Sequence, residues 1–288
     1  MGTADQISGS KRNCNFKFKE KNLRNFVSKI FGMLANFHFP SKLQNFINKQ
    51  YIKAFNIDMS EFKNVENYKS LNELFTRSLI KQRDFSDLRN DFISPSDGMI
   101  FECGKSESFK AFSIKGREYD IKELLGELAP QKKQNFEYAN IYLSPKDYHH
   151  YHAPCDISVL SALYIPADLY SVAAKVLLKI PRVYEKNERV ILKCKMANDA
   201  FLWLVFVGAL NVGKMKFDFD DRIKTNAKNR QISKYNYENL KIKKGEHLGN
   251  FELGSTIVII AENESLKFSC NRGESIKFGQ NLAKISNL

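Results

Sequence analysis

Residues 249–260 read GNFELGSTIVII, and this stretch decides how the chain is interpreted. The β-branched run at 257–260 is typical of a buried strand, and the sequence KKGE at 243–246 is typical of a turn. Gly254 and Ser255 are therefore expected where an irregular segment enters a strand. A glycine turn before a core strand explains the pattern taken alone. A catalytic interpretation needs more, because a serine hydroxyl is a weak nucleophile without an adjacent base.

The composition narrows the class of protein. The chain has 288 residues, 43% of them hydrophobic, and a formal net charge of +13 at pH 7. These values are typical of a globular protein with one large domain or two small ones. The positive charge favours anionic partners, of which nucleic acid and anionic lipid are the candidates. The sequence has no aromatic and basic recognition motif, so we expect no nucleic-acid partner.

Five cysteines are widely spaced along the chain, and no two of them form a CxxC pair. This pattern indicates reduced thiols, not a disulfide framework or a zinc site. No run of residues approaches the ~20 consecutive apolar residues of a membrane span. The polar N-terminus does not have the pattern of a secretory signal.

The N-terminal part of the chain has helical periodicity. Residues 1–20 are expected to be a flexible leader, and residues 21–90 a helical region. The first helix ends before Pro40, Ser41 is the expected cap of a second helix, and a capping-box pattern opens a third over 70–79.

The second helix carries Leu43, Phe46, Ile47 and Ile52 as an apolar stripe beside basic residues. In an ordinary helical layer such a stripe packs on the core. In a protein that acts on lipid, a basic amphipathic helix can instead lie in the membrane interface.

From Asp91 the sequence changes to short β-rich segments separated by glycines. Strands are expected near residues 98–101, 140–143, 157–160, 189–192, 201–207 and 257–260. The predicted fold class is α+β, with an N-terminal helical layer packed on a mainly antiparallel β catalytic core at residues 91–288.

Three of the five histidines fall within residues 147–154. Such a cluster favours metal ligation or acid/base chemistry near neutral pH. Zinc would need a further ligand, for which His247 is a candidate, and neither a cysteine pair nor an HExxH spacing supports it. Acid/base chemistry is the preferred interpretation. Asp97, in an Asp-Gly pair before a strand, is either a turn residue or the acid that orients a histidine.

Three long motifs together resemble the phosphatidylserine decarboxylase family, whose members are pyruvoyl enzymes made by self-cleavage. The family motif Leu-Gly-Ser-Thr is matched at residues 253–256, Tyr-Leu-x-Pro-x-Asp-Tyr-His-x-x-His-x-Pro at 142–154, and Ser-Pro-x-Asp-Gly at 94–98. Shorter matches include Phe-Thr-Arg at 75–77 and Asn-Glu-Arg-Val at 187–190. The resemblance runs from about residue 23 to the C-terminus.

The resemblance implies maturation by a triad of Asp97, His152 and Ser255. His152 would take the Ser255 proton while Asp97 fixes the histidine tautomer, as in a hydrolase triad. The serine hydroxyl would attack the Gly254 carbonyl. Elimination and hydrolysis would then release ammonia and leave a pyruvoyl group, the implied cofactor, derived from Ser255.

Cleavage between these two residues would give chains 1–254 and 255–288, which are expected to stay together because the small chain begins with a buried strand. The implied reaction is decarboxylation of phosphatidylserine to phosphatidylethanolamine, with the pyruvoyl group as electron sink. His149 is the candidate acid/base for that step. His150 is expected to be a bystander, and no metal is implied.

A lipid substrate favours the interfacial interpretation of the helical region. We expect Phe26, Ile30 and Phe31 to insert into an anionic membrane surface. The resemblance also implies a homodimer. A peripheral location on the cytoplasmic face of the inner membrane is expected because the sequence shows no signal or transit segment.

Two other functions were considered. A lipoyl- or biotin-type carrier module would need an exposed lysine at the turn that Gly254 and Ser255 occupy. A zinc hydrolase would use His149, His152 and His247, and stoichiometric zinc would identify it.

Overall fold

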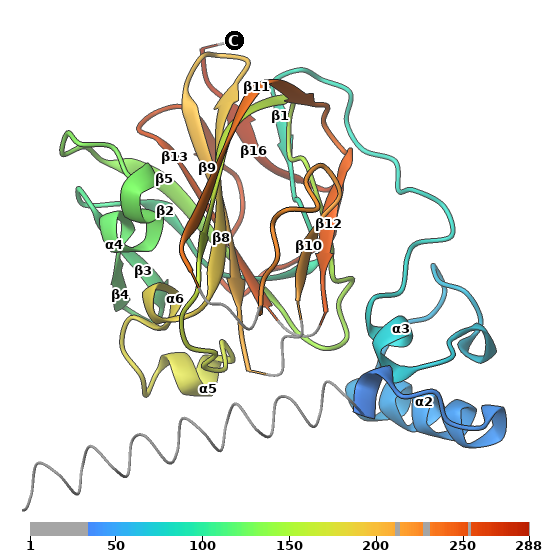
Figure 1. The fold of residues 1–288 in the computed structure, drawn as a ribbon. Coiled ribbons are helices and arrows are strands. Elements are labelled where there is room, and N and C mark those ends of the chain that lie inside the picture. The colour runs from blue at the N-terminus through green and yellow to red at the C-terminus, as the bar shows by residue number, and fades with distance from the viewer. Residues whose placement is uncertain (1–33, 211–213, 227–230, 253–254, 288) are drawn as a thin grey trace, which may run out of the picture.

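An eight-stranded sheet forms the centre of the molecule (Figure 1). The computed structural model describes residues 34–210, 214–226, 231–252 and 255–287. All strand pairs of the central sheet are antiparallel, which confirms the predicted mainly antiparallel α+β fold. Its strands, in spatial order, are β11 (Ser233–Ile242), β7 (Ile157–Ile165), β8 (Arg189–Met196), β9 (Phe201–Gly208), β13 (Ser255–Glu262), β5 (Phe136–Leu143), β2 (Gly98–Lys105) and β15 (Ser275–Ile276).

Two three-stranded sheets and a set of short helices cover the two faces of the central sheet. One face packs against β1 (Asp91–Ile93), β16 (Asn281–Ile285) and β14 (Leu266–Phe268), and against β10 (Met215–Phe217), β12 (His247–Phe251) and β6 (His150–His152). The other face packs against β3 (Lys110–Ile114), β4 (Arg117–Asp120), α4 (Ile121–Leu125), the 3₁₀ turn Gly126–Leu128, α5 (Ala174–Leu177) and α6 (Val183–Lys186).

Strand β13 lies in the middle of this arrangement and is buried on both sides. Ile257 and Ile259 belong to the core beneath the three-stranded sheets, whereas Val258 and Ile260 belong to the core beneath the short helices. Burial on both faces explains why this strand is a continuous apolar run and does not alternate. Its neighbours are β5 and β9, so Ser255 is flanked by strands on both sides.

Helices α2 (Ser41–Phe55) and α3 (Leu71–Phe75), with the 3₁₀ turn Val65–Asn67, lie at one end of the sheets (Figure 1). The predicted cap at Ser41 is wrong: Ser41 is the first helical residue, and Pro40 occupies the cap position without a side-chain bond. Ser70 does cap α3, where its Oγ accepts from the Glu73 amide at 3.1 Å.

Helix α3 is shorter than the predicted 70–79. It ends at Phe75, because Leu79 pairs with Phe62 in a β-bridge that needs extended backbone. The segment that follows runs in an extended path to β1, along the side of the molecule (Figure 1).

Helix α2 turns its polar side inward. Gln44 and Asn48 are buried and bonded to each other, and Asn48 donates to the Tyr68 carbonyl at 3.0 Å. Leu43 and Phe46 of the predicted apolar stripe are 46% and 59% exposed. These two side chains therefore do not pack on the core as the stripe of an ordinary helical layer would. No helix in the described part of the chain is long and apolar enough to cross a membrane.

Candidate active site

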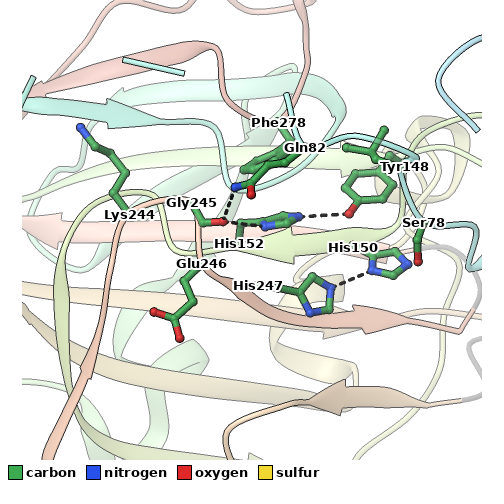
Figure 2. Close-up of a pocket in the computed structure, with 11 residues that line it drawn as sticks. Ser78, Gln82, Tyr148, His150, His152, Lys244, Gly245, Glu246, His247 and Phe278 are labelled. Carbon is green, nitrogen blue, oxygen red and sulfur yellow. Dashed lines mark hydrogen bonds between the residues drawn. The ribbon is translucent and has the colours of Figure 1, made fainter. Parts of the chain in front are cut away.

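The clustered histidines are held by strand pairing. Strand β6 pairs with β12, which sets His152 opposite His247 and His150 opposite Asn250. The turn predicted at 243–246 leads directly into β12, so part of the expected irregular segment before Ser255 is a strand instead. The rings of His150, His152 and His247 gather around one cavity (Figure 2).

His152 has both ring nitrogens occupied. Nδ1 lies 3.0 Å from the Gly245 carbonyl and must donate to it, so Nε2 accepts from the Tyr148 hydroxyl at 3.1 Å (Figure 2). The Phe278 ring stacks on the imidazole at 3.7 Å. Burial, with a further contribution from His247, lowers the pKa of His152 to about 3. His152 is therefore neutral at pH 7, with its basic lone pair held by Tyr148.

Asp97 does not bond directly to His152. Its carboxylate accepts from Arg83 at 2.5 and 3.1 Å and from the Phe278 backbone amide at 2.8 Å, and these are its hydrogen bonds among the described residues. It is nevertheless close to the histidine, since the His152 amide donates to the Pro95 carbonyl at 2.8 Å. Asp97 thus holds the backbone of the residue whose ring stacks on His152.

The Asp-Gly pair has a steric reason. A Cβ on Gly98 would lie 2.6 Å from the Tyr142 carbonyl oxygen, closer than Cβ atoms can approach, so β2 reaches β5 at this point only with glycine. This close approach brings Asp97 to the end of β5, where the histidine segment begins.

Ser255 is the first residue of β13, and it pairs with Leu143 on one side and Gly208 on the other. Its side chain is fully buried, and Oγ has no hydrogen-bond partner among the described residues. Gly254, the other half of the expected cleavage site, lies outside the described residues. A buried hydroxyl without a partner costs about 1–3 kcal/mol, so native structures seldom keep one.

His149 also has a buried polar atom without a hydrogen-bond partner in the described part of the chain. Its Nδ1 donates to the Asp147 carbonyl at 2.9 Å, while Nε2 is buried and without a partner among the described residues. The Phe75 ring packs on it at 3.9 Å. Burial and then the charge of Arg77 lower the pKa of His149 to about 3, so Nε2 presents a free lone pair at pH 7.

Two pairings limit how far apart His149 and Ser255 can lie. The Phe251 amide donates to the His149 carbonyl at 3.0 Å, and the chain from Phe251 to Ser255 spans at most about 14 Å even when extended. At its other end, the segment leading to His149 starts at Leu143, the strand partner of Ser255. Short segments of chain therefore connect His149 to Ser255 on both sides, and they limit the distance between the two residues.

The triplet Phe-Thr-Arg at 75–77 holds the histidine segment from outside. Arg77 is 1% exposed and donates to the carbonyls of Lys146 and Asp147 at 2.6 and 3.1 Å. Thr76 offers its carbonyl to His150, and Phe75 covers His149. Sequence reasoning gave this triplet little weight, although an arginine beside buried apolar residues was the available signal.

His150 and His247 form a hydrogen-bonded chain that requires an extra proton. His150 Nδ1 lies 2.7 Å from His247 Nε2 (Figure 2). His150 Nε2 lies 3.0 Å from the Thr76 carbonyl, and His247 Nδ1 lies 2.5 Å from Asp218 Oδ2. The two outer partners only accept, so both outer nitrogens carry hydrogens, and the central contact needs a third. Burial lowers the pKa of His150 to about 4.

The cavity beside these rings has a volume of about 570 Å³. His150, His152 and His247 line it, together with Ser78, Leu79, Gln82, Tyr148, Lys244, Gly245, Glu246 and Phe278. Asp97 lines a separate cavity of about 220 Å³, and Tyr148 borders both. The expected triad is therefore not joined by direct hydrogen bonds among the described residues. Asp97 and His152 both contact Phe278, through its backbone amide and its ring respectively. Ser255 is linked to His149 by the short segments on either side of the two residues.

A metal site needs at least three free ligands. In the part of the chain that the structure describes, no group of three or more His, Cys, Asp or Glu side chains is arranged to hold a metal ion. The ring nitrogens of His150, His152 and His247 are engaged by protein atoms.

Comparisons with known proteins agree with the site. The family model described as phosphatidylserine decarboxylase matches residues 71–284. A "Phosphatidylserine decarboxylase proenzyme" of Campylobacter jejuni is 53% identical over 262 residues, which cover 89% of this chain and 97% of the relative. One of Helicobacter pylori is 48% identical, over 91% of this chain and 98% of the relative. One of Herminiimonas arsenicoxydans is 34% identical, over 92% and 90%.

Proposed function

The chain belongs to the phosphatidylserine decarboxylase family, and we propose that it cleaves itself at Ser255 and then converts phosphatidylserine to phosphatidylethanolamine. The observation that carries this proposal is that Ser255 Oγ and His149 Nε2 are both buried and have no hydrogen-bond partner among the described residues. Neither atom serves the stability of the fold, so both are available for chemistry.

A pyruvoyl group derived from Ser255 fits this environment. Position 255 is fully buried between two strands, so a carbonyl formed there would be shielded from bulk water. Removing the serine hydroxyl would also remove an unsatisfied polar atom. When formed, the group supplies an electron sink for loss of CO2 from the substrate.

The maturation that we propose begins with the Ser255 hydroxyl, which attacks the Gly254 carbonyl and converts the amide to an ester. Loss of the Ser255 α-proton expels the Gly254 carboxylate and leaves dehydroalanine. Water then replaces the nitrogen, which departs as ammonia. In this scheme His152 takes the serine proton, and Asp97 positions His152 through Phe278.

This assignment makes a specific demand on Tyr148. Because the Tyr148 hydroxyl occupies Nε2 of His152, that histidine becomes available to Ser255 only when the bond opens. The lone pair of His149 is already free. We assign His149 to decarboxylation, where it would carry a proton to the carbon that loses CO2.

Single variants separate the two histidines. We expect His152→Ala to remain uncleaved, and His149→Ala to be cleaved but unable to decarboxylate phosphatidylserine. Tyr148→Phe should still be cleaved, because it frees Nε2. If His149→Ala stayed uncleaved while His152→Ala was cleaved, the maturation role would belong to His149 and not to His152.

Intact-mass measurement under denaturing conditions tests the function as a whole. The expected result is two fragments split after Gly254. Their summed mass should equal the mass of the precursor plus one water and minus one ammonia. Decarboxylation of vesicle-borne phosphatidylserine completes the test. A folded chain that remains full length after long incubation contradicts the proposal.

Helix α2 supports docking on a membrane. Leu43 and Phe46 are exposed on α2, Phe55 is exposed at its end, and Leu34 and Phe37 are exposed in the segment before it, all 41–59% exposed. Lys42, Lys49 and Lys53 lie exposed on the same helix. Apolar side chains amid lysines suit an anionic lipid surface. Phe26, Ile30 and Phe31, expected from the sequence to insert, lie outside the described residues and remain part of the proposal.

The proposal includes a homodimer, as the family resemblance implies, and a peripheral location on the cytoplasmic face of the inner membrane. Light scattering on the purified protein should then give twice the chain mass.

A further inference from the structure

A pair of cysteines lies apart from the histidine site. Cys103 belongs to β2, and Cys270 follows β14, far away in the sequence. The Cys103 thiol donates a hydrogen bond to the Cys270 carbonyl oxygen at 3.2 Å, which places this thiol against the backbone of Cys270. Both residues are partly exposed. The fold therefore creates a contact between two accessible thiols that the spacing of cysteines in the sequence does not predict.

The backbone on both sides fixes this contact. The Gly273 amide donates to the Ile100 carbonyl at 2.7 Å, and the Ile100 amide donates to the Glu274 carbonyl at 2.8 Å. Arg272 adds an ion pair with Glu102 at 3.5 Å. A disulfide has an S–S bond of about 2.05 Å and tolerates little distortion. Because Cys103 Sγ already lies against the Cys270 backbone, the two residues need little backbone movement to form a disulfide.

The pair also has the asymmetry that thiol chemistry uses. The hydrogen bond from Cys270 lowers the pKa of Cys103, against the opposing effects of burial, Glu102 and Glu274, and it raises the pKa of Cys270. The thiolate is the nucleophile in disulfide formation. Cys155 and Cys194 provide the contrast, because they are fully buried and burial raises the pKa of both.

We propose that Cys103 and Cys270 form a disulfide when the protein meets a small-molecule disulfide oxidant. The Cys103 thiolate attacks one sulfur of the oxidant and expels a thiolate. Cys270, on losing its proton, then attacks the mixed disulfide and expels the second thiolate. Each protein thiol loses one hydrogen, and the oxidant is reduced to two thiols.

The consequence depends on the proposed self-cleavage. Cys103 would lie in chain 1–254 and Cys270 in chain 255–288, so the disulfide would join the two chains covalently. The chain that carries the reactive group would then be held by a bond as well as by its strand contacts.

The test uses the purified protein treated with oxidised glutathione, quenched with N-ethylmaleimide and measured by intact mass under denaturing conditions. We expect one linked species, with the mass of both chains less two hydrogens plus any N-ethylmaleimide added to the other cysteines, which dithiothreitol separates into two. Cys103→Ser and Cys270→Ser should each give separate chains after oxidation. Cys14→Ser is the matched control and should keep the link.

Separate chains in the oxidised wild type, or a link that persists in Cys270→Ser, would overturn the proposal. Digestion without reductant distinguishes this failure from a failure of self-cleavage. In an uncleaved chain, a linked peptide containing Cys103 and Cys270 would still support the disulfide while removing the two-chain consequence. Alkylated Cys103 and Cys270 peptides after oxidation would overturn it in either form of the protein.

Discussion

Strand β13 and helix α2 are both rich in apolar side chains, but they place them in opposite environments. In β13 every residue from Ser255 to Ala261 is buried, including a hydroxyl without a partner. In α2 the buried residues are Gln44 and Asn48, while Leu43 and Phe46 face outward. Apolar side chains hold the core together in the first case. In the second they form a surface whose natural partner lies outside the chain.

The largest effect is expected at the buried hydroxyl. Ser255→Ala should abolish cleavage and decarboxylation completely, because the attacking oxygen and the source of the pyruvoyl group are both lost. Intact mass and vesicle assays measure the two losses. The fold should be retained, since no hydrogen bond to Oγ is removed. Any cleaved Ser255→Ala protein would show that this oxygen is not the nucleophile.

Acid should destabilise the core through its histidines. Burial lowers the pKa values of His149, His150 and His152 to about 3, 4 and 3, below the usual value of 6.5. The unfolded chain therefore binds more protons below pH 6.5, and stability present above that pH is lost as the pH falls towards the folded values. Each histidine contributes up to about 1.4 kcal/mol per pH unit.

Denaturant titration of uncleaved Ser255→Ala at pH 7.5 and pH 5 measures this loss. Adding His149→Gln should reduce the slope of the free energy of unfolding against pH by about the contribution of one bound proton. Equal stability at the two pH values would contradict the burial of neutral histidines.

The two regions should respond oppositely to truncation. Ile259→Ala in β13 should cost about 3 kcal/mol, because it leaves a cavity in a packed core. In α2 the costly change is polar: Asn48→Ala should lose about 2 kcal/mol by leaving Gln44 and the Tyr68 carbonyl without partners. Urea midpoints on the Ser255→Ala background compare them. A neutral Asn48→Ala would break the contrast.

The smallest effect on stability, and a clear effect on binding, is expected on the outer face of α2. The double variant Leu43→Ser and Phe46→Ser should change the free energy of unfolding, measured by urea titration, by no more than about 0.5 kcal/mol, because both side chains are exposed. Flotation with anionic phospholipid vesicles should fall about tenfold or more, given the apolar area lost from the interface. Ile232→Ser, at an exposed position on another part of the surface, is the control. Undiminished flotation would remove α2 from the docking surface.

The sequence predicted the parts of this molecule that local pattern determines. The β-branched run predicted β13 with Ser255 at its start, and the clustered histidines predicted a segment from which His150 and His152 line the cavity. The pattern showed that α2 is amphipathic, but it could not show which side faces the protein, because buried amides satisfy each other only in the folded layer. The contacts of Arg77, Tyr148 and Phe278 with the site were missed for the same reason, since they join residues far apart in the sequence.

The position of β13 between β5 and β9 has a consequence for how the protein can be made. The precursor folds as a single chain, so its unfolding is unimolecular. After the proposed cleavage, β13 would be a separate strand that completes a sheet supplied by another chain, and unfolding would release two molecules. The midpoint of unfolding should then depend on protein concentration, and refolding would carry the entropy cost of association. Folding therefore has to precede cleavage. Once separated, the two chains of the mature enzyme would reassemble only slowly at low concentration.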